Sequence, residues 1–409
     1  MGPRSNVRGR VVRGHCRLVI SIKSCTLAAL SCAAVLGCAS PPERPQRSLE
    51  ELVAYRRGDD VARANELRVL SDRFLARIAA KGQGGRQPTI DILVISGGGD
   101  WGAFGAGVLK GWGRVKGEFA RPQFDIVTGV STGALIAPFA FLGDEQSIER
   151  IVRLYRNPRK DIAAARGTLF FLPNNPSFYV LPGLESELQS ALDRPMIERI
   201  AAEGSSGRAL LVNTTNIDLG DMRAWDVVAE SRVALTRNDE RYLHQILLAS
   251  AGIPAIFPAR GIGDYLYVDG AITGNVLYGG RTREDERLLS RWKAAHPRGP
   301  QPRVRYWVIL NNQLRFPPQV TPDKWPDIMT RATIMSTQTS TVNSIRHLYA
   351  LAELEELKYK ADVQVRLISV PDDWVPSKPG TFVKEVMNDL ADVGERMGAD
   401  PKSWRTEAP

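Results

Sequence analysis

Cysteine is scarce in this chain of 409 residues, and its positions exclude several kinds of chemistry. The four cysteines are Cys16, Cys25, Cys32 and Cys38, so the chain beyond residue 38 has none. That part of the protein can hold no disulfide framework, no thiol nucleophile and no zinc site built from cysteines. Metal-ligand spacing such as H-E-x-x-H is missing as well, and we expect neither a metal nor another cofactor.

The N-terminal region also lacks an apolar run long enough to cross a bilayer. Its apolar stretch, Cys25–Gly37, is about 13 residues long, whereas a membrane-spanning helix needs about 20. A basic region ending at Lys23 precedes it, which is the layout of a secretion signal. The stretch ends in Val35-Leu36-Gly37-Cys38, which resembles a bacterial lipobox. We therefore expect a lipoprotein signal peptide over residues 1–37 and lipidation of Cys38, with an ordinary signal peptide as the alternative.

A protein with this start would be exported and lipid-anchored to a bacterial membrane. In a cell with two membranes, Ala39 after the lipidated cysteine resembles the signal for the outer membrane. Residues 38–88 would form a proline-rich tether followed by one or two amphipathic helices over residues 48–81. The sequence leaves the oligomeric state open.

Charge of one sign is in excess only at the N-terminus. The formal net charge is +9, and residues 1–37 contain six basic residues and no acidic one. The rest of the chain is close to balance and carries no nucleic-acid-binding motif, so we expect no nucleic-acid partner.

Beyond Thr89, apolar runs alternate with segments of helical spacing. Strands are predicted at residues 90–96, 124–128, 209–214, 265–268, 304–310 and 363–370. Helices are predicted near residues 102–116, 132–141, 145–156, 184–202, 241–250, 327–358 and 381–396. This alternation indicates an α/β fold, a mostly parallel central sheet sandwiched by helices, within one domain over residues 89–400. Residues 157–183 are predicted to be an insertion or lid.

A glycine-rich segment, Ser96–Gly107, follows the first predicted strand and opens a helix. Backbone N–H groups at such a turn suit an anion, either a phosphate or the oxyanion of a tetrahedral intermediate. Gly97, Gly99 and Gly102 also fit the G-x-G-x-x-G pattern of dinucleotide-binding proteins. That pattern requires an acid at the end of the next strand, but Asp125 lies near its start, so a dinucleotide site is disfavoured.

Two further motifs supply a nucleophile and an acid. Gly129-Val-Ser-Thr-Gly133 lies between a predicted strand and a predicted helix, the context of a nucleophile elbow, which makes Ser131 the candidate nucleophile. Asp269-Gly270 follows the strand predicted at residues 265–268, and an acid there could reach the same edge of the sheet. Taken alone, Asp269-Gly270 is also typical of an ordinary turn between strands.

In this order, the glycine-rich segment, the elbow and Asp269-Gly270-Ala271 resemble the patatin-like phospholipase family, as a bacterial member of lipoprotein type. Ala249–Pro254, followed by Phe257-Pro258, resembles the family's segment before the aspartate, and Asn275 lies where family members often have asparagine. The resemblance is clear over residues 89–280. One position departs from it, because Asp100-Trp101 stands where many members carry Arg or Lys.

The resemblance implies the patatin-like three-layer fold and a catalytic dyad without histidine. Ser131 would be the nucleophile and Asp269 its base, with an oxyanion hole at Gly97, Gly98 and Gly99. Gly129, Gly133, Gly102 and Gly270 would shape the motifs around them. The expected reaction is hydrolysis of a carboxylic ester in a phospholipid or another acyl lipid, through an acyl-enzyme.

Two alternatives stay open. A Ser-His-Asp triad would need His244, His296 or His347, but His244 precedes Asp269 and none of the three follows a strand in the expected loop. A catalytically silent, membrane-anchored binding protein is the second alternative.

The apolar segment Leu169–Leu181 fits an interfacial lipid substrate, or else a packed loop. Head-group and sn-position preference are not predicted.

Overall fold

The computed structural model describes residues 44, 46–167, 175–279 and 282–409. Residues 47–409 form one compact unit. The predicted signal peptide, the predicted lipidation site Cys38 and much of the apolar segment Leu169–Leu181 lie outside the described residues. Within the described part of the chain, no helix is long and apolar enough to cross a membrane.

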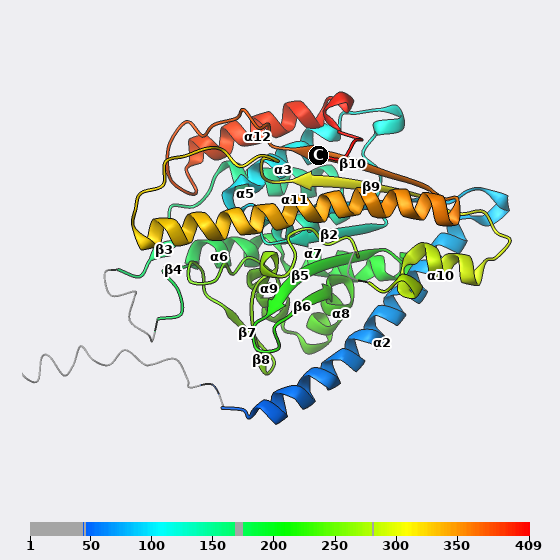
Figure 1. Cartoon of the computed structure of the whole chain (residues 1–409), viewed down its shortest axis with the longest axis horizontal. Coiled ribbons are helices and arrows are strands. Elements are labelled where there is room, and N and C mark those ends of the chain that lie inside the picture. The colour runs from blue at the N-terminus through cyan, green and yellow to red at the C-terminus, as the bar shows by residue number, and fades with distance from the viewer. Residues whose placement is uncertain (1–43, 45, 168–174, 280–281) are drawn as a thin grey trace, which may run out of the picture. The chain divides into compact units, whose positions relative to one another are not determined.

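An eight-stranded sheet forms the centre of this unit (Figure 1). The strand order is β10-β9-β1-β2-β5-β8-β7, and β6 pairs with β5 beside this path. Strands β10, β9, β1, β2 and β5 are parallel, β6 and β8 pair antiparallel to β5, and β7 pairs antiparallel to β8. The bounds are β1 Thr89–Ile95, β2 Ile126–Val130, β5 Ala209–Asn216, β6 Asp221–Asp226, β7 Arg260–Ile262, β8 Tyr265–Asp269, β9 Arg303–Leu310 and β10 Asp362–Ser369. A separate two-stranded ladder joins β3 (Ala164–Ala165) to β4 (Tyr179–Val180).

The described helices surround this sheet. They are α2 Leu49–Lys81, α3 Gly102–Trp112, α4 Thr132–Leu142, α5 Glu145–Arg156, α6 Pro182–Ala191, α7 Arg194–Ala202, α8 Val227–Arg237, α9 Glu240–Ser250, α10 Leu288–Ala295, α11 Trp325–Tyr359 and α12 Lys384–Gly398. The single helix predicted at residues 184–202 is wrong: it is two helices, because the Asp193 side chain caps α7 and Pro195 lies in its first turn. Strands β6 and β7 and helices α8 and α10 were not predicted, since β6 is polar and the others are short or only weakly patterned.

The helices cover both faces of the sheet, which confirms the predicted α/β architecture. Leu93 and Ile95 of β1 belong to one hydrophobic core together with buried side chains of α3, α4, α5 and α12. The alternate residues Ile92 and Val94 belong to a second core with buried side chains of α2, α10 and α11. Successive side chains of a strand point to opposite faces, so one apolar strand serves both cores.

Helices α3 and α12 pack unusually closely through glycine. A Cβ atom on Gly107 or Gly111 of α3 would collide with the backbone of α12, and one on Gly394 or Gly398 would collide with the backbone of α3. Residues 96–101, here called the glycine-rich turn, lead directly into α3. The packing of α3 on α12 therefore holds the C-terminal part of the chain beside that turn.

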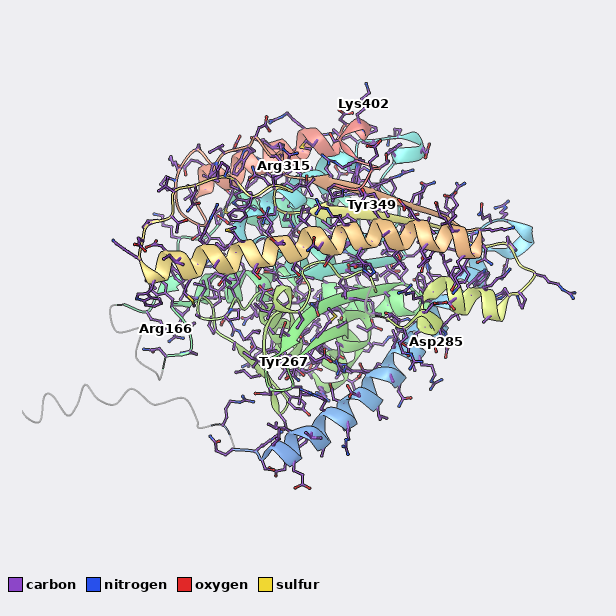
Figure 2. All side chains as sticks on the ribbon, viewed as in Figure 1. Arg166, Tyr267, Asp285, Arg315, Tyr349 and Lys402 are labelled. Carbon is purple, nitrogen blue, oxygen red and sulfur yellow. The ribbon has the colours of Figure 1, made fainter. Side chains whose placement is uncertain are left out.

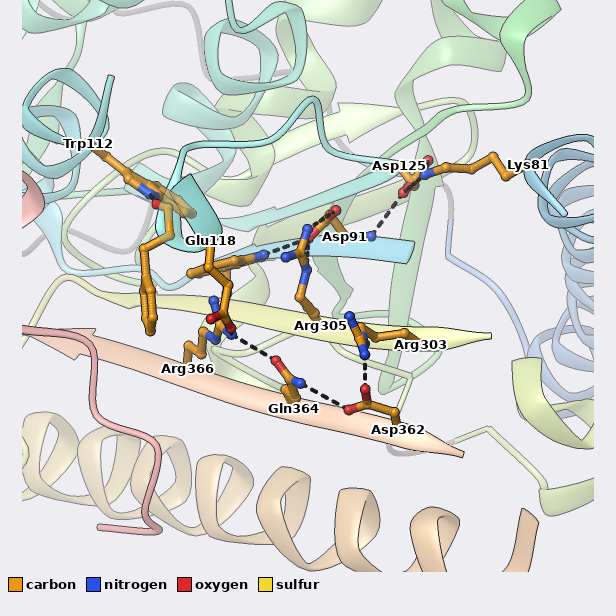
Figure 3. A network of polar contacts seen from close by, with 12 residues as sticks. Lys81, Asp91, Trp112, Glu118, Asp125, Arg303, Arg305, Asp362, Gln364 and Arg366 are labelled. Atoms are coloured by element: carbon orange, nitrogen blue, oxygen red, sulfur yellow. Dashed lines mark hydrogen bonds and ion pairs between the residues drawn. The ribbon is translucent and has the colours of Figure 1, made fainter. Parts of the chain in front are cut away.

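A polar network ties α2 to the amino-terminal edge of the sheet (Figure 3). Asp125 is fully buried and accepts hydrogen bonds from Arg77 Nε at 2.6 Å, from Lys81 Nζ and from the Asp91 amide. Asp91 in turn accepts two hydrogen bonds from the Arg305 guanidinium. A buried carboxylate needs such partners. Asp125 therefore has a structural role at the edge opposite the carboxyl ends of the parallel strands.

Candidate active site

The turn between β2 and α4 has the geometry of a nucleophile elbow. Ser131 adopts φ 54° and ψ −124°, in the left-handed region that a residue with a side chain rarely occupies. A Cβ on Gly129 would collide with the backbone of Gly133, and a Cβ on Gly133 would collide with the carbonyl groups of Ile95 and Ser96. The two glycines are therefore required for the tight approach of strand, turn and helix.

A buried serine, Ser250 at the end of α9, supports this turn from behind. The Ser131 amide donates to Ser250 Oγ at 3.0 Å, and Ser250 Oγ donates to the Asn213 carbonyl at 2.6 Å. Ser250 is fully buried, so this link cannot be replaced by bulk water. Ser250 belongs to the segment Ala249–Pro254 that resembles the family, but no role was predicted for it.

The glycine-rich turn contacts Ser131. A Cβ on Gly97 would lie 2.8 Å from the Ser131 Cβ and 2.6 Å from Asn275 Oδ1. The Gly97 amide donates to Asn275 Oδ1 at 2.8 Å, so it is not free to bind an oxyanion, contrary to the role predicted for it. Within the described part of the chain, the amides of Gly98 and Gly99 have no acceptor. These two amides are the donors that the turn offers beside Ser131.

Gly102 marks where this turn joins α3. A Cβ there would collide with Thr132 Oγ1 and lie 2.7 Å from the Tyr155 hydroxyl. The absence of a side chain at Gly102 therefore lets the start of α3 lie against the start of α4.

Two buried asparagines fix the glycine-rich turn from both sides. Asn275 accepts from Gly97 and donates through Nδ2 to Thr341 Oγ1 of α11 at 3.0 Å. Asn311, which follows β9, donates through Nδ2 to the Ser96 carbonyl and accepts from the Gly105 amide. Asn311 was not predicted. The signal that could have found it is an amide residue directly after an apolar strand that pairs with β1.

Asp269 lies beside Ser131. The strand that carries it, however, is not one of the parallel strands of the sheet. Strand β8 runs antiparallel to β5, and the pairing of Thr214 with Asp269 brings the acid to the site. Asn213 Nδ2 then donates to the carbonyls of Gly270 and Gly274 at 2.8 and 2.9 Å, which fixes the turn after the acid. A Cβ on Gly270 would collide with the Asn213 carbonyl, so glycine is needed there.

Burial makes Asp269 an unusual carboxylate. Its side chain is only 2% exposed, and this burial raises its pKa to about 7. Hydrogen bonds from the Ala271 amide and from the Ser131 hydroxyl oppose that rise. The carboxylate is therefore held against the serine hydroxyl and can accept a proton near neutral pH.

The histidines lie in other environments. His244 Nε2 lies 2.9 Å from the Leu192 carbonyl, His296 stacks on Trp292, and His347 Nδ1 lies 2.6 Å from the Tyr278 hydroxyl. None of the three is hydrogen-bonded to Ser131 or Asp269 in the described structure. The described residues also contain no cluster of three His, Cys, Asp or Glu side chains that could hold a metal ion.

A largely apolar cavity opens beside Ser131. It encloses about 790 Å³, its open mouth included. Among its described lining residues, Glu187 alone carries a charge, and burial raises the pKa of this carboxyl. The apolar lining comes from α4, α5, α6, α12 and the segments after α5, after α9 and before α12: Leu135, Phe139, Ile151, Leu154, Ile162, Leu184, Leu188, Ala191, Ala251, Ile253, Phe257, Phe382 and Met387. A cavity with this lining suits a hydrocarbon chain.

Comparison with known proteins finds a family model that covers this site. The family model described as patatin-like phospholipase matches residues 93–279, which contain the glycine-rich turn, the elbow and Asp269. No curated protein matches the chain in sequence. Among solved structures, the crystal structure of VipD from Legionella pneumophila matches with a TM-score of 0.35 and 10% identity. That match covers 76% of this chain and 66% of VipD, slightly less than two thirds. Residues 93–279 of this chain are therefore similar to the patatin-like phospholipase family.

Proposed function

We propose that the protein is a lipid acyl hydrolase that cleaves carboxylic esters through a Ser131–Asp269 dyad. The observation that carries this proposal is the contact of a strained serine with a buried carboxylate of raised pKa, beside an apolar cavity. Each part has a separate function in ester hydrolysis: nucleophile, base and acyl-chain site.

In the first half of the reaction, Ser131 Oγ attacks the ester carbonyl carbon while its proton passes to Asp269. The carbonyl oxygen becomes an oxyanion, which the amides of Gly98 and Gly99 would stabilise. Removing one such donor typically raises the barrier by about 2.7–4 kcal/mol. The intermediate then expels the alcohol, which takes the proton from Asp269 and leaves an acyl-enzyme on Ser131.

In the second half, water attacks the acyl-enzyme and gives a proton to Asp269. The second tetrahedral intermediate releases the fatty acid, and the proton returns to Ser131 Oγ. A carboxylate with a pKa of about 7 suits both directions of transfer, since neither its acid nor its base form is strongly disfavoured at neutral pH.

The substrate we propose is the acyl ester of a phospholipid or a similar lipid in a membrane. The apolar cavity supports an acyl chain. Exposed apolar side chains flank two of its lining segments: Ile256 stands beside Phe257, and Val375 lies in the segment that ends at Phe382. Lipidation at Cys38 would hold the enzyme at such a surface, and this anchoring is part of the proposal.

The proposal is tested with purified protein, phospholipid vesicles and a fluorophosphonate probe. We expect fatty acid release and labelling by the wild type, and loss of both in Ser131→Ala. Asp269→Asn should lower kcat by about a thousandfold or more, because the serine loses its proton acceptor. Alanine at His244, His296 or His347 should leave ester hydrolysis largely intact.

Three results would contradict parts of this proposal. A thousandfold loss at one histidine would replace the dyad by a triad. Turnover of peptides or thioesters alone would remove the lipid assignment. A folded wild type that is neither labelled nor active would favour a binding protein.

A further inference from the structure

Residues 371–383, here called the strap, connect β10 to α12 and pass beside the glycine-rich turn. Most of the strap is exposed; Val375, for example, is 74% exposed. Both of its ends are nevertheless attached to the protein, and each end contacts one of the two residues that follow Gly99.

The first end is fixed by side chain to backbone contacts. The amides of Leu314 and Arg315 both donate to Asp372 Oδ1, at 2.9 and 3.0 Å, and Arg315 is labelled in Figure 2. Gln313 Nε2 donates to the carbonyls of Pro371 and Trp374. The Trp374 ring then packs edge-on against Trp101, with 5.0 Å between ring centroids.

The second end is held by Asp100. Its Oδ2 accepts a hydrogen bond from the Phe382 amide at 2.8 Å. Phe382 adopts φ 57°, a strained conformation for a residue with a side chain, which persists only where surrounding contacts enforce it. Asp100 is 8% exposed, and burial raises its pKa while the Phe382 amide opposes that rise. The hydrogen bond therefore satisfies a buried acceptor and fixes a strained residue at once.

The strained residue faces the cavity. Phe382 lines the same apolar cavity as Ser131 and Gly99, and its ring lies 6.4 Å from that of Phe257, which lines it too. Asp100 directly follows Gly99, one of the two donors proposed for the oxyanion. One carboxylate thus connects the proposed oxyanion hole to a wall of the acyl-chain cavity.

We propose that Phe382 is a specificity-determining residue for the acyl chain and that Asp100 is the positioning residue that holds it in the cavity wall. This inference rests on the proposed hydrolase function. It also gives a physical reason for Asp100-Trp101, the dipeptide that departs from the family pattern: both side chains bind the strap. An acyl chain that fills the cavity contacts the Phe382 ring, whereas a butyryl group beside Ser131 gains much less from it.

The test compares kcat/KM for p-nitrophenyl decanoate and p-nitrophenyl butyrate. In Phe382→Ala, the decanoate-to-butyrate ratio should fall about tenfold, the size of effect that small changes in an apolar pocket produce. Asp100→Ala should also lower the ratio. The double variant should lower it little further, because both changes remove the same part of the cavity wall, the Phe382 ring. Asp100→Asn keeps a side-chain carbonyl oxygen as acceptor and should restore most of the ratio.

Ser377→Ala is the matched control, since this exposed residue belongs to the strap but does not line the cavity, and it should leave the ratio unchanged. Circular dichroism checks that each variant is folded. If Asp100 acted on the oxyanion turn alone, kcat would fall equally for both esters, and that result would overturn the inference. A ratio within twofold of the wild type in folded Phe382→Ala would overturn it as well.

Failure of the hydrolase proposal gives a different pattern. In a Ser131→Ala background, decanoate displaces a fluorescent fatty acid without any turnover. We expect its affinity to drop about tenfold with Phe382→Ala. A wild type that cleaves neither ester would defeat the proposed function, and the decanoate affinity would still decide whether Phe382 is a wall of the cavity.

Discussion

Asp269 is the residue whose chemistry depends most on its surroundings. A carboxyl with an ordinary pKa is a weak base toward a serine hydroxyl. Burial at 2% exposure raises the pKa of Asp269 to about 7, and the Ser131 hydroxyl still donates to it. The removal of water therefore makes the Asp269 carboxylate a stronger base, and the contact with Ser131 places it next to the proton.

The raised pKa predicts the pH dependence of the proposed reaction. The base must be deprotonated in the free enzyme, so kcat/KM should fall about tenfold per pH unit below about pH 7 and level off above it. The measurement is kcat/KM for a soluble short-chain ester between pH 5 and pH 9. A rate that stays constant down to pH 5 would mean that Asp269 does not act as the base.

The same burial predicts a stability change. The pKa of Asp269 is about 7 in the folded protein and near 3.8 when unfolded. Between these values the folded state keeps a proton that the unfolded state has lost, so this contribution to stability is full below pH 3.8 and is lost as the pH rises through 7. Asp269→Asn cannot ionise and should therefore raise the free energy of unfolding at pH 8, by on the order of a few kcal/mol.

Urea unfolding of the wild type and Asp269→Asn at pH 8 and pH 4.5 measures this effect. The difference in the free energy of unfolding between the two proteins should be larger at pH 8 than at pH 4.5. An Asn variant that is less stable than the wild type at pH 8 would show that the charged carboxylate is stabilised by its partners rather than strained by burial.

Among the elements, α2 is attached to the sheet chiefly by charge. Only Phe74 and Ile78 of its 33 residues are buried, while Arg77 and Lys81 reach the buried Asp125. Breaking a buried ion pair from one side leaves an unpaired charge, which typically costs 3–5 kcal/mol. We therefore expect Arg77→Ala combined with Lys81→Ala to lower the free energy of unfolding by about that amount.

Arg68→Ala is the control for this change. Arg68 lies on the same helix and its pair with Asp72 is half-exposed, so the effect should stay within about 0.5 kcal/mol. The activity of the folded double variant toward a soluble ester should be unchanged, because the network lies at the edge of the sheet away from Ser131. If the double variant lost less than about 1 kcal/mol of its free energy of unfolding, Asp125 would have found other partners.

For the whole molecule, the predicted anchor and the catalytic unit should be separable. Residues 47–409 form a compact unit of their own. In the full chain, Cys38→Ser should prevent lipidation and move the protein from the membrane fraction to the soluble fraction of the expressing cells. Hydrolysis of a soluble short-chain ester should be unaffected, whereas hydrolysis of membrane phospholipid should fall. Fractionation combined with mass spectrometry of the N-terminus tests this, and a Cys38→Ser protein that stays on membranes would contradict it.

Local sequence patterns were sufficient for the architecture of this protein. Apolar runs and helical spacing predicted six strands that the structure contains. Each strand or helix of an α/β fold has its own hydrophobic pattern within a short segment of the chain. Gly129, Ser131 and Gly133 could also be found locally, because a strained turn with close backbone contacts leaves little choice of residue on either side of Ser131.

Only the tertiary structure decided what surrounds that turn. Ser250, Asn213, Asn311 and Phe382 contact the site from segments far away in the sequence, and no local pattern distinguishes them from ordinary core or loop residues. The position of Asp269 depends on its antiparallel pairing with Thr214, and its raised pKa depends on the protein packed around it. The sequence by itself determined the fold class and the serine at the elbow, because these rest on local backbone requirements. Packing between distant segments decided the surroundings of Asp269, the free amides and the wall of the cavity, because burial and hydrogen bonding exist only once those segments meet.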